Sequence, residues 1–363
     1  MSNALKVNLV CYEDVNQWIL GKFARRMNEI LVADGHDVTI STKPDHMADI
    51  NHHIIYYDYK TELACACDTL MITHIDTVTK LSLLKDQLRV ASAGICMSQE
   101  TRINLIEAGI DQSKLHVVNP AHDGIIPIKK KYFGITCRVQ NDGRKREHLL
   151  VRLSQELDPA YFGFIIMGDG WEPCIKELEE TGFNVEFHRD FQPEIYAGLF
   201  QRMDYYLYMG LDEGQMGFVD ACAAGIETLV TDQGYHQDAK GGMTFPFLTE
   251  EELLAIAREL QSDRRQLVES VAGWNWQSYT DQHVQIWRQL LSGVDNTNLG
   301  FAGKPKLRGV LKQFIHVFRS PVSTFHRTPK MVVRDLFLMT KEVFPGLQGV
   351  WKWYKSWRTR RNA

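Results

Sequence analysis

Three acids and two glycines stand together in the stretch LDEGQMGFVDACAAG: Asp212, Glu213, Gly214, Gly217 and Asp220. The small and apolar residues that follow predict a helix packed closely on a sheet, and the next strand begins directly after it. Packing explains the alanines, but it does not explain an acid inside the apolar run. Acids beside glycines at a helix N-terminus present carboxylates and backbone N–H groups to a sugar or a phosphate. The stretch is therefore a candidate ligand site.

Other candidate groups follow predicted buried strands. Arg138 ends FGITCRV, and Lys145 comes a few residues later in a basic cluster, where a solvated lysine is the alternative interpretation. His74 and Asp76 lie in THIDT after an apolar strand, and a lone histidine there is more often structural than catalytic. Gly168 ends FIIMGDG. Arg189 follows another strand, and a surface role is an equal alternative for it.

The elements that must position these groups form an α/β pattern in two halves. Apolar strand runs at 5–12, 35–42, 52–57, 69–74, 94–98 and 115–119 alternate with helical stretches, one of them at 16–33. After a segment rich in Pro, Gly and Lys the pattern restarts, with strands at 133–139, 161–170, 183–189, 205–210 and 228–232. Amphipathic helices follow at 249–262 and 276–291. We expect parallel sheets with ligands at the carboxyl ends of their strands, in a cleft between the halves.

Composition narrows the class of protein. The 363 residues are 44% hydrophobic and 24% charged, as in a globular protein that needs more than one core. No apolar run approaches the roughly 20 residues of a membrane span, and no signal pattern is seen, so we expect a cytoplasmic protein. The seven cysteines include no CxxC pair, which favours a reducing compartment and core roles. No Asp-x-Asp motif or zinc spacing is present, and no metal cofactor is expected.

The C-terminal tail is strongly basic. Residues 301–363 hold 14 Lys and Arg against two acids, a net charge of +12, so the first 300 residues carry a net charge of −16 within the total of −4. Helical periods are predicted at 307–318, 331–339 and 350–361, the last with three tryptophans among basic residues. Such a tail favours an anionic membrane surface as partner, at the inner face of the cytoplasmic membrane. Packing of the tail on the acidic body or a second subunit is the alternative, and nucleic acid is disfavoured because no RNA- or DNA-binding module is seen.

Six pieces in colinear order resemble the retaining glycosyltransferases of family 4 (glycosyl transferases group 1), which have the GT-B fold. The resemblance covers about residues 5 to 291, and its strength is the order of the pieces. They are ADGHDVTI (33–40), ICMSQETRINLIEAGIDQSKLHVVNPAHDG (95–124), FGITCRVQNDGRK (133–145), FIIMGDG (164–170), the acidic stretch above, and WNWQSYTDQHVQIWRQLL (274–291).

The resemblance implies two Rossmann-like domains facing across a cleft. The expected division is an acceptor domain, a linker, a nucleotide-sugar donor domain, a helix that crosses back, and a basic amphipathic helical tail: 1–123, 124–132, 133–273, 274–296 and 297–363. The family's glycine-rich first loop is not evident here, because Gly21 is the only glycine nearby and lies in the predicted helix. His52, His53 and Tyr56 are candidates for the acceptor side, with core or surface roles as the alternative.

The resemblance also implies roles. Arg138 and Lys145 match the cations that hold the donor's two phosphates as the glycosidic bond breaks. Asp220 stands where a glutamate accepts hydrogen bonds from the ribose, and either Asp212 or Glu213 is the first acid, since Asp212 has the spacing and Glu213 the following glycine. His74, with Asp76 nearby, matches a histidine beside the donor sugar. The residues expected to contact the donor are Arg138, Lys145, Gly168, Arg189, Asp212, Glu213, Gly214, Gly217 and Asp220.

Four functions stay open at this point. The preferred one is a metal-independent glycosyltransferase that uses a nucleotide-sugar donor and a glycan or lipid-linked acceptor, in bacterial surface polysaccharide or glycoconjugate synthesis. A nucleotide-sugar 2-epimerase shares the architecture but needs an acid/base set that the sequence does not show. A catalytically inactive GT-B partner is favoured slightly by the short acid at Asp220. Binding of nucleic acid through the tail is the fourth.

Overall fold

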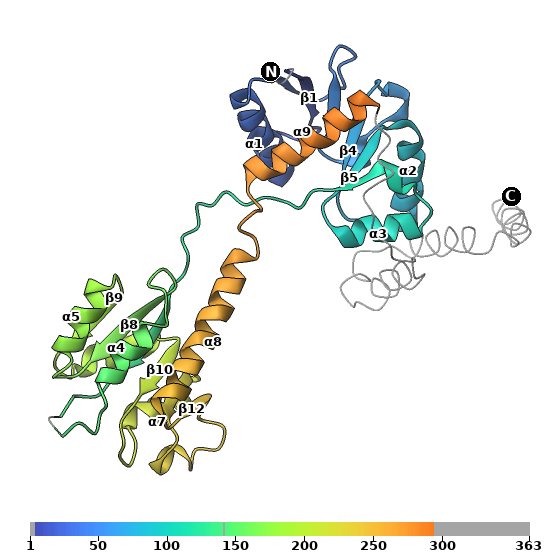
Figure 1. Cartoon of the computed structure of the whole chain (residues 1–363). Helices are drawn as coiled ribbons and strands as arrows, with labels where there is room; N and C mark the ends of the chain where they lie inside the picture. Colours follow the sequence, from blue (N-terminus) through green and yellow to red (C-terminus); the bar gives the residue numbers. More distant parts are fainter. Residues whose placement is uncertain (1–3, 141, 294–363) are drawn as a thin grey trace, which may run out of the picture. The chain divides into compact units, whose positions relative to one another are not determined.

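The computed structural model describes residues 4–140 and 142–293. The predicted tail helices at 307–318, 331–339 and 350–361 lie outside the described residues. The described residues divide into two compact units, which are described separately: 4–123 with 274–293, and Gly124–Gly273 (Figure 1). All seven cysteines are free thiols, and most are buried, as expected.

The first unit contains a six-stranded, fully parallel sheet in the order β2-β1-β3-β4-β5-β6. Its strands are β1 (Lys6–Val10), β2 (Asp37–Ser41), β3 (Ile50–His53), β4 (Asp68–Ile72), β5 (Ala93–Cys96) and β6 (Leu115–Val117). Its helices are α1 (Ile19–Ala33), α2 (Val78–Val90), α3 (Gln99–Glu107) and α9 (Trp276–Ser292), with short 3-10 turns at Tyr56–Asp58, Thr61–Leu63 and Gln112–Lys114.

Alternate residues of β4 serve two cores, one on each face of this sheet. Leu70 and Ile72 pack with α2 and α3, whereas Met71 packs with α1 and α9. Strands buried on both faces read as continuous apolar runs, which is why the sequence pattern located most of them. The helix α9 closes the second of these cores with Trp276 and Trp287, both buried.

The second unit repeats the parallel arrangement with the order β12-β11-β10-β7-β8-β9. Its strands are β7 (Lys131–Ile135), β8 (Phe162–Met167), β9 (Asn184–His188), β10 (Tyr205–Tyr208), β11 (Glu227–Thr231) and β12 (Phe245–Phe247). Its helices are α4 (His148–Ser154), α5 (Glu172–Glu180), α6 (Pro193–Phe200), α7 (Met216–Ala224) and α8 (Glu250–Glu269), with a 3-10 turn at Gly234–His236.

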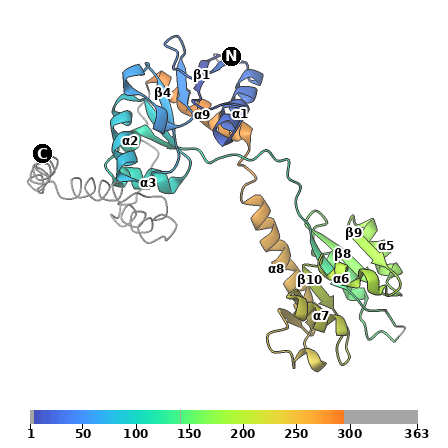
Figure 2. The same cartoon turned by 180° about the vertical axis from the view of Figure 1, so that it is seen from behind.

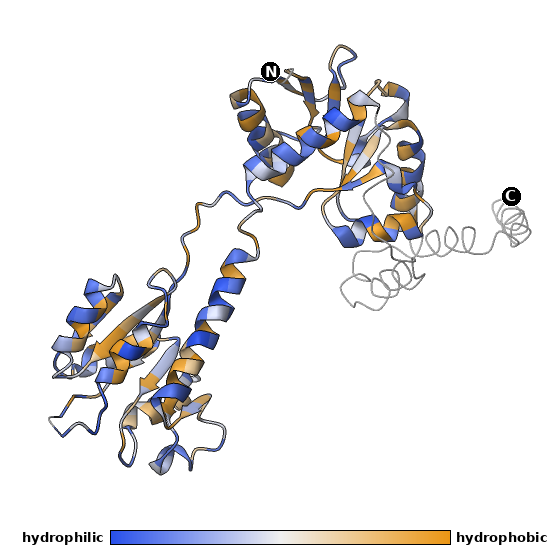
Figure 3. Cartoon of the chain, in the orientation of Figure 1, coloured by the Kyte–Doolittle hydropathy of each residue, from blue (hydrophilic) through white to orange (hydrophobic). Residues whose placement is uncertain are grey.

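Helices cover both faces of this second sheet. Helix α4 packs against both α5 and α8, and α6 is labelled in the view from behind (Figure 2). The strands are largely apolar, whereas α8 alternates polar and apolar residues (Figure 3). A capping box of Thr249 and Glu252 starts α8 by satisfying backbone N–H groups of its first turn. Two doubly wound parallel sheets of this kind confirm the predicted α/β class with two Rossmann-like domains.

Several predicted boundaries were wrong. The strand expected at 52–57 is Ile50–His53, because the buried Tyr56 belongs to a 3-10 turn. The segment expected as a linker to residue 132 ends earlier, since the Lys131 N–H donates to the Tyr161 carbonyl (2.8 Å) and opens β7. Helix α1 begins only at Ile19, after a residue with φ 38°, and α8 extends to Glu269. The edge strand β12 was not predicted, because three residues carry too little periodicity.

Candidate functional site

The second sheet reverses its strand order at one point, between β7 and β10. The chain proceeds from β7 to β8 and β9 on one side, and β10, β11 and β12 lie on the other. At such a switch point the connections leave on opposite faces of the sheet and open a crevice at the carboxyl ends of the strands. The loops that follow β7 and β10 carry Arg138, Lys145 and Asp212, so the topology brings the predicted cations and one predicted acid to this edge.

A buried cation lies at the centre of this edge. The Lys145 ammonium donates to Asp212 Oδ2 (2.8 Å) and to the Tyr208 hydroxyl (2.6 Å), and it lies 4.8 Å from the centre of the Tyr208 ring. Its side chain is only 9% exposed, against 18% for Asp212. A lysine in a solvated cluster would not be held in this way. The carboxylate and the phenol fix the ammonium in one place, as a site for an anion requires.

Asp212 is bound from three sides. Its Oδ1 accepts the Tyr208 hydroxyl proton and the Gly214 N–H (3.2 Å), while Oδ2 holds Lys145. Burial raises the pKa of this carboxyl, but the bonds from Lys145, Tyr208 and Gly214 outweigh burial, and its pKa lies below the usual value. Glu213 is exposed, and its carbonyl accepts the Tyr235 N–H (3.0 Å). Of the two candidates for the first acid, only Asp212 contacts Lys145.

The rest of the basic cluster has other partners. Arg144 lies 3.2 Å from Asp142 and 4.0 Å from Asp212. The Arg146 guanidinium donates to the carbonyls of Met209 (2.6 Å) and Leu248 (2.8 Å), which is a structural role. Lys145 is thus the member of the cluster that the fold turns inward.

Arg138 is exposed in the loop that follows β7, and its side chain forms no hydrogen bond or ion pair with a residue that the structure describes. The loop itself is fixed. The Trp171 indole donates to the Cys137 carbonyl (2.6 Å), and a Cβ at Gly168 would meet that same carbonyl oxygen at 2.1 Å. With φ 148°, Gly168 combines a backbone conformation that favours glycine with this close approach. Gly168 therefore positions the Arg138 loop instead of simply ending a strand.

The N-terminus of α7 is held against the same edge. A Cβ at Gly217 would lie 2.2 Å from both Thr136 Oγ1 and the Tyr206 hydroxyl, so only glycine fits. The Gln215 amide donates to the Thr136 carbonyl (2.9 Å), and the Gln215 N–H donates to His236 Nε2 (3.1 Å). His236 is fully buried, its Nδ1 donates to the Thr231 carbonyl (2.9 Å), and burial lowers its pKa.

The remaining predicted donor contacts lie apart from Lys145. Asp220, on α7, is exposed and accepts a hydrogen bond from the Tyr196 hydroxyl (2.6 Å). Arg189 is exposed and pairs with Asp169 (2.8 Å) and Glu172 (3.5 Å) at the end of β9. Among the described residues, neither Asp220 nor Arg189 forms a hydrogen bond or ion pair with Lys145, Tyr208 or Asp212.

His74 and Asp76 belong to the other unit, in the loop after β4. His74 is exposed, and its carbonyl accepts the Tyr56 hydroxyl (3.2 Å). Asp76 pairs with Lys80 (2.8 Å); burial raises the pKa of its carboxyl, but the Lys80 contacts outweigh burial and the pKa is lowered. Both residues lie beyond the carboxyl end of a central strand, where ligands of open parallel sheets bind.

Sequence reasoning missed Tyr208, Gln215 and His236. Tyr208 had a signal, because Tyr206 and Tyr208 are two residues apart in a strand and so share a face at its carboxyl end. Gln215 stands between the two glycines of the acidic stretch. His236 had no signal, since its contact with the Gln215 N–H depends on the 3-10 turn after β11.

Within residues 4–140 and 142–293, no group of three or more His, Cys, Asp or Glu side chains could hold a metal ion. Across the same ranges, no helix is long and apolar enough to cross a membrane.

Comparisons with known proteins give only distant structural likenesses. No protein-family model and no curated protein matches the chain. Anabaena HepE in complex with UDP and glucose is similar at 14% identity and a TM-score of 0.32, over 80% of this chain and 100% of that one. Sucrose-phosphate synthase from Thermosynechococcus elongatus is similar at 13% identity and a TM-score of 0.34, over 79% of this chain and 99% of that one. The lipopolysaccharide outer core galactosyltransferase WaaB, in its apo form, is similar at 11% identity and a TM-score of 0.33, over 80% of this chain and 99% of that one. Likenesses with such scores carry no inference about activity.

Proposed function

We propose that the protein is a metal-independent retaining glycosyltransferase that moves a sugar from a nucleotide-sugar donor to a glycan or lipid-linked acceptor. The observation that carries the proposal is the buried ammonium of Lys145, held by Tyr208 and Asp212 at the switch point of the second unit. A fixed cation at the carboxyl edge of a Rossmann-like sheet suits a diphosphate, because the leaving group gains negative charge as the glycosidic bond breaks.

The roles of the site residues follow from their contacts. Because Asp212 neutralises much of the Lys145 charge, the exposed Arg138 supplies the unpaired cation, and its planar guanidinium can hold two phosphate oxygens at once. Asp212, ionised through its three bonds, is the proposed acid beside the donor sugar. Gly217 lets the start of α7 lie against Thr136 and Tyr206, and the backbone at Gly214 and Gly217 is the proposed contact with the donor. Asp220 is the proposed acceptor for the ribose hydroxyls, and Arg189 is the proposed contact with the base. His74 and Asp76 would contact the sugar from the first unit.

The proposed setting is bacterial surface polysaccharide or glycoconjugate synthesis, with the basic tail at an anionic membrane surface. Sedimentation with liposomes of phosphatidylglycerol and phosphatidylethanolamine tests the tail. Binding by the full chain and not by a form without residues 301–363 supports the proposal, and equal binding refutes it. The charge of the tail is the reason to expect this result, at roughly 1 kcal/mol per basic residue near the surface.

A second candidate is a GT-B partner protein that binds a nucleotide without transferring a sugar. One observation favours it: Asp220 is shorter than a glutamate, and its carboxylate is engaged by Tyr196. Release of nucleoside diphosphate from a panel of UDP-, GDP- and dTDP-sugars separates the two. Turnover, even to water as acceptor, supports the enzyme, whereas tight nucleotide binding without release in any mixture supports the partner.

A further inference from the structure

The first sheet has its own switch point, between β1 and β3, and it also carries a pair of polar side chains. The chain leaves β1 for β2 on one side of the sheet and returns to β3 on the other. Tyr12 follows β1 and His53 ends β3, and the Tyr12 hydroxyl lies 3.1 Å from His53 Nδ1. Tyr12 is half-buried, so its hydroxyl lies at the border between core and solvent. The crevice expected at this edge therefore has a phenol on its wall.

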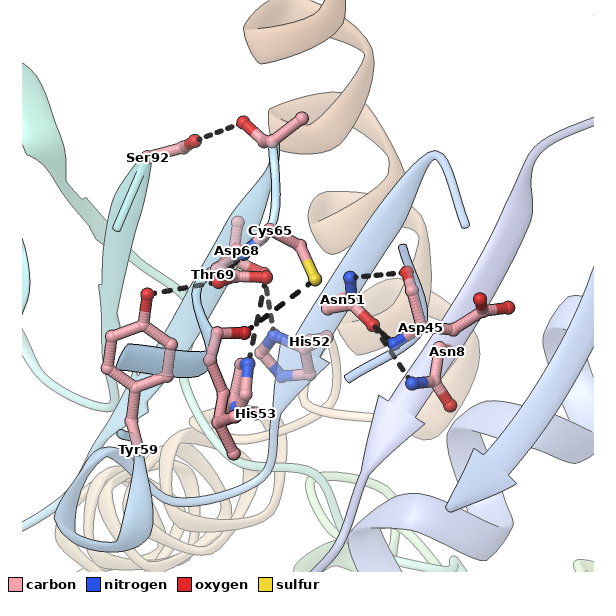
Figure 4. Close-up of polar contacts among 12 residues, drawn as sticks. Asn8, Asp45, Asn51, His52, His53, Tyr59, Cys65, Asp68, Thr69 and Ser92 are labelled. Atoms are coloured by element: carbon pink, nitrogen blue, oxygen red, sulfur yellow. Dashed lines mark hydrogen bonds and ion pairs between the residues drawn. The ribbon is translucent and has the colours of Figure 1, made fainter. Parts of the chain in front are cut away.

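A buried carboxylate stands behind the histidine. Asp68 and His53 are both fully buried, and His53 Nε2 lies 3.8 Å from Asp68 Oδ1 (Figure 4). Neither of these two atoms has a hydrogen-bond partner among the described residues. The other carboxylate oxygen accepts the Tyr59 hydroxyl (2.9 Å) and the Cys65 N–H (2.8 Å). Within the described chain, two buried polar atoms without hydrogen-bond partners, Asp68 Oδ1 and His53 Nε2, thus lie 3.8 Å apart.

The donor in the hydrogen bond between Tyr12 and His53 depends on the tautomer of the imidazole, and these contacts favour one tautomer. Burial, followed by the charges of Asp58 and Asp68, raises the pKa of Tyr12 to about 12, so the phenol keeps its proton at neutral pH. The favoured arrangement has the imidazole proton on Nε2, toward the Asp68 oxygen, and Nδ1 accepting the phenol proton. The lone pairs of the Tyr12 oxygen are then left to accept a hydrogen bond from a ligand.

We infer that Tyr12 accepts a hydrogen bond from a hydroxyl of a carbohydrate acceptor, and that Asp68 and His53 are positioning residues that fix the direction of this bond. The choice of a carbohydrate rests on the proposed function. A directed acceptor selects a ligand hydroxyl over groups that cannot donate, because an unmatched buried polar atom is costly. It also draws electron density toward the oxygen that must attack the sugar.

A purely structural role explains less of the arrangement. The segment 56–59 is already fastened by Gln87, whose amide donates to the carbonyls of Tyr56 (2.7 Å) and Tyr59 (2.9 Å). The Tyr59 hydroxyl fastens Asp68 in turn, and neither bond needs a histidine. Burial of a carboxylate costs free energy unless another group interacts with the charge, and His53 is the group placed to do so.

The loop that carries Tyr12 has a second feature suited to a sugar. Trp18, at its end, is 78% exposed and has φ 38°, a conformation that bulky residues rarely adopt. Strain of this kind gathers at ligand sites. A Cβ at Gly21 would lie 2.5 Å from the Val15 carbonyl oxygen, so the loop folds back closely on α1. An exposed indole and a directed phenol in one loop offer the apolar surface and the polar contact that sugar rings use.

The tautomer of His53 is the first test, on the full chain labelled with 15N-histidine. Two-bond NMR correlations are expected to show a proton on Nε2 and none on Nδ1. In Asp68→Asn the amide can donate to Nε2 instead, which should move the proton to Nδ1. A proton on Nδ1 in the wild type, or a tautomer that Asp68→Asn leaves unchanged, would overturn the inference.

Ligand binding is the second test, with methyl α-glucoside, methyl α-galactoside and methyl α-mannoside as probes in saturation-transfer NMR. Tyr12→Phe should weaken the bound glycoside about threefold to tenfold, the range for one neutral hydrogen bond. Tyr57→Phe is the matched control, because Tyr57 is an exposed tyrosine of the same unit whose ring contacts are with Tyr56 and Lys80 and not with Tyr12, His53 or Asp68. Equal affinities in both variants, or no glycoside binding by the wild type, would refute the inference.

A UDP titration of the same samples separates the two proposals. Tyr12→Phe should leave UDP affinity unchanged, because Tyr12 belongs to the first unit. Glycoside binding without binding of any nucleoside diphosphate would refute the proposed function, but it would leave the inferred role of Tyr12, His53 and Asp68 in glycoside binding intact. If Tyr12→Phe binds nucleotide and its glycoside affinity is unaltered, the inference about Tyr12 is refuted and the proposed function stands.

Discussion

Replacing Asp212 with asparagine should move two properties of the protein in opposite directions. The carboxylate stabilises the buried ammonium of Lys145, and it also reduces the positive charge that a diphosphate meets. Asp212→Asn keeps the shape of the side chain but removes its charge. We therefore expect a less stable second unit that binds UDP, or whichever nucleoside diphosphate is the ligand, more tightly.

The size of each effect follows from the burial of the pair. Removing one partner of a fully buried ion pair costs about 3–5 kcal/mol. Lys145 keeps the Tyr208 hydroxyl, and the two side chains are 9% and 18% exposed, so we expect a loss of about 2 kcal/mol in unfolding free energy. A unit charge about 4 Å from a phosphate contributes about 1 kcal/mol in a water-like medium, which corresponds to roughly fivefold tighter binding.

Urea unfolding and isothermal titration with the nucleoside diphosphate measure the two quantities on one preparation. Asp142→Asn is the control, because Asp142 is a half-exposed carboxylate in the same loop that pairs with Arg144. It should change stability by less than about 0.5 kcal/mol. If Asp212→Asn weakens binding while it destabilises the protein, or changes neither property, then Lys145 is not the phosphate contact and the reasoning is wrong.

Four further outcomes are expected. Gly168→Ala should cost about 3 kcal/mol and abolish nucleotide binding, because its Cβ would meet Cys137, whereas Gly182→Ala, with φ 89° and nothing closer than 3.8 Å, should cost about 1 kcal/mol in urea unfolding. Burial lowers the pKa of His283 to about 4, so its contribution is complete above pH 6.5 and falls by about 2 kcal/mol between pH 6.5 and 5; hydrogen exchange of α9 should show this loss, and His283→Gln should remove it. Asp220→Ala should weaken UDP binding about tenfold and 2′-deoxy-UDP binding less, whereas equal losses would separate Asp220 from the ribose. Arg138→Ala should weaken UDP binding by tenfold or more without a change in unfolding free energy, and an unaltered titration would remove it from the site.

Most of the fold could be predicted from the sequence because both sheets are parallel and buried. Runs such as FGFIIM in β8 stay apolar at every position, so the strands stand out from the helices between them. The wrong boundaries occur where a residue is buried without belonging to a strand, or is apolar without being buried. Tyr56 is buried, yet it lies in a 3-10 turn, and the sequence could not distinguish the two. The helix predicted at 16–33 included Trp18, but this residue is exposed and precedes Ile19, where α1 begins.

The sequence indicated which residue types lie at this edge of the second sheet, but it did not indicate which of them pair with one another. Arg138, Lys145 and Asp212 follow strands, and parallel topology gathers strand ends at one edge, so their common location could be inferred. The pairing of Lys145 with Asp212 spans 67 residues, and no local pattern encodes it. The contrast between His52 and His53 is of the same kind. Adjacent in sequence, they face opposite sides of β3, His52 toward His283 of α9 (4.9 Å) and His53 toward Tyr59 (4.7 Å).

Calorimetric titration of the full chain with UDP, GDP, dTDP and ADP, with EDTA and again with Mg²⁺, tests the central claim most directly. The Lys145 site predicts saturable binding of one nucleoside diphosphate, equal in EDTA and Mg²⁺, and at least tenfold weaker in Lys145→Met. If no nucleotide binds under either condition, or if Lys145→Met binds as well as the wild type, the second unit does not hold a donor diphosphate at this edge and the proposed glycosyl transfer is contradicted.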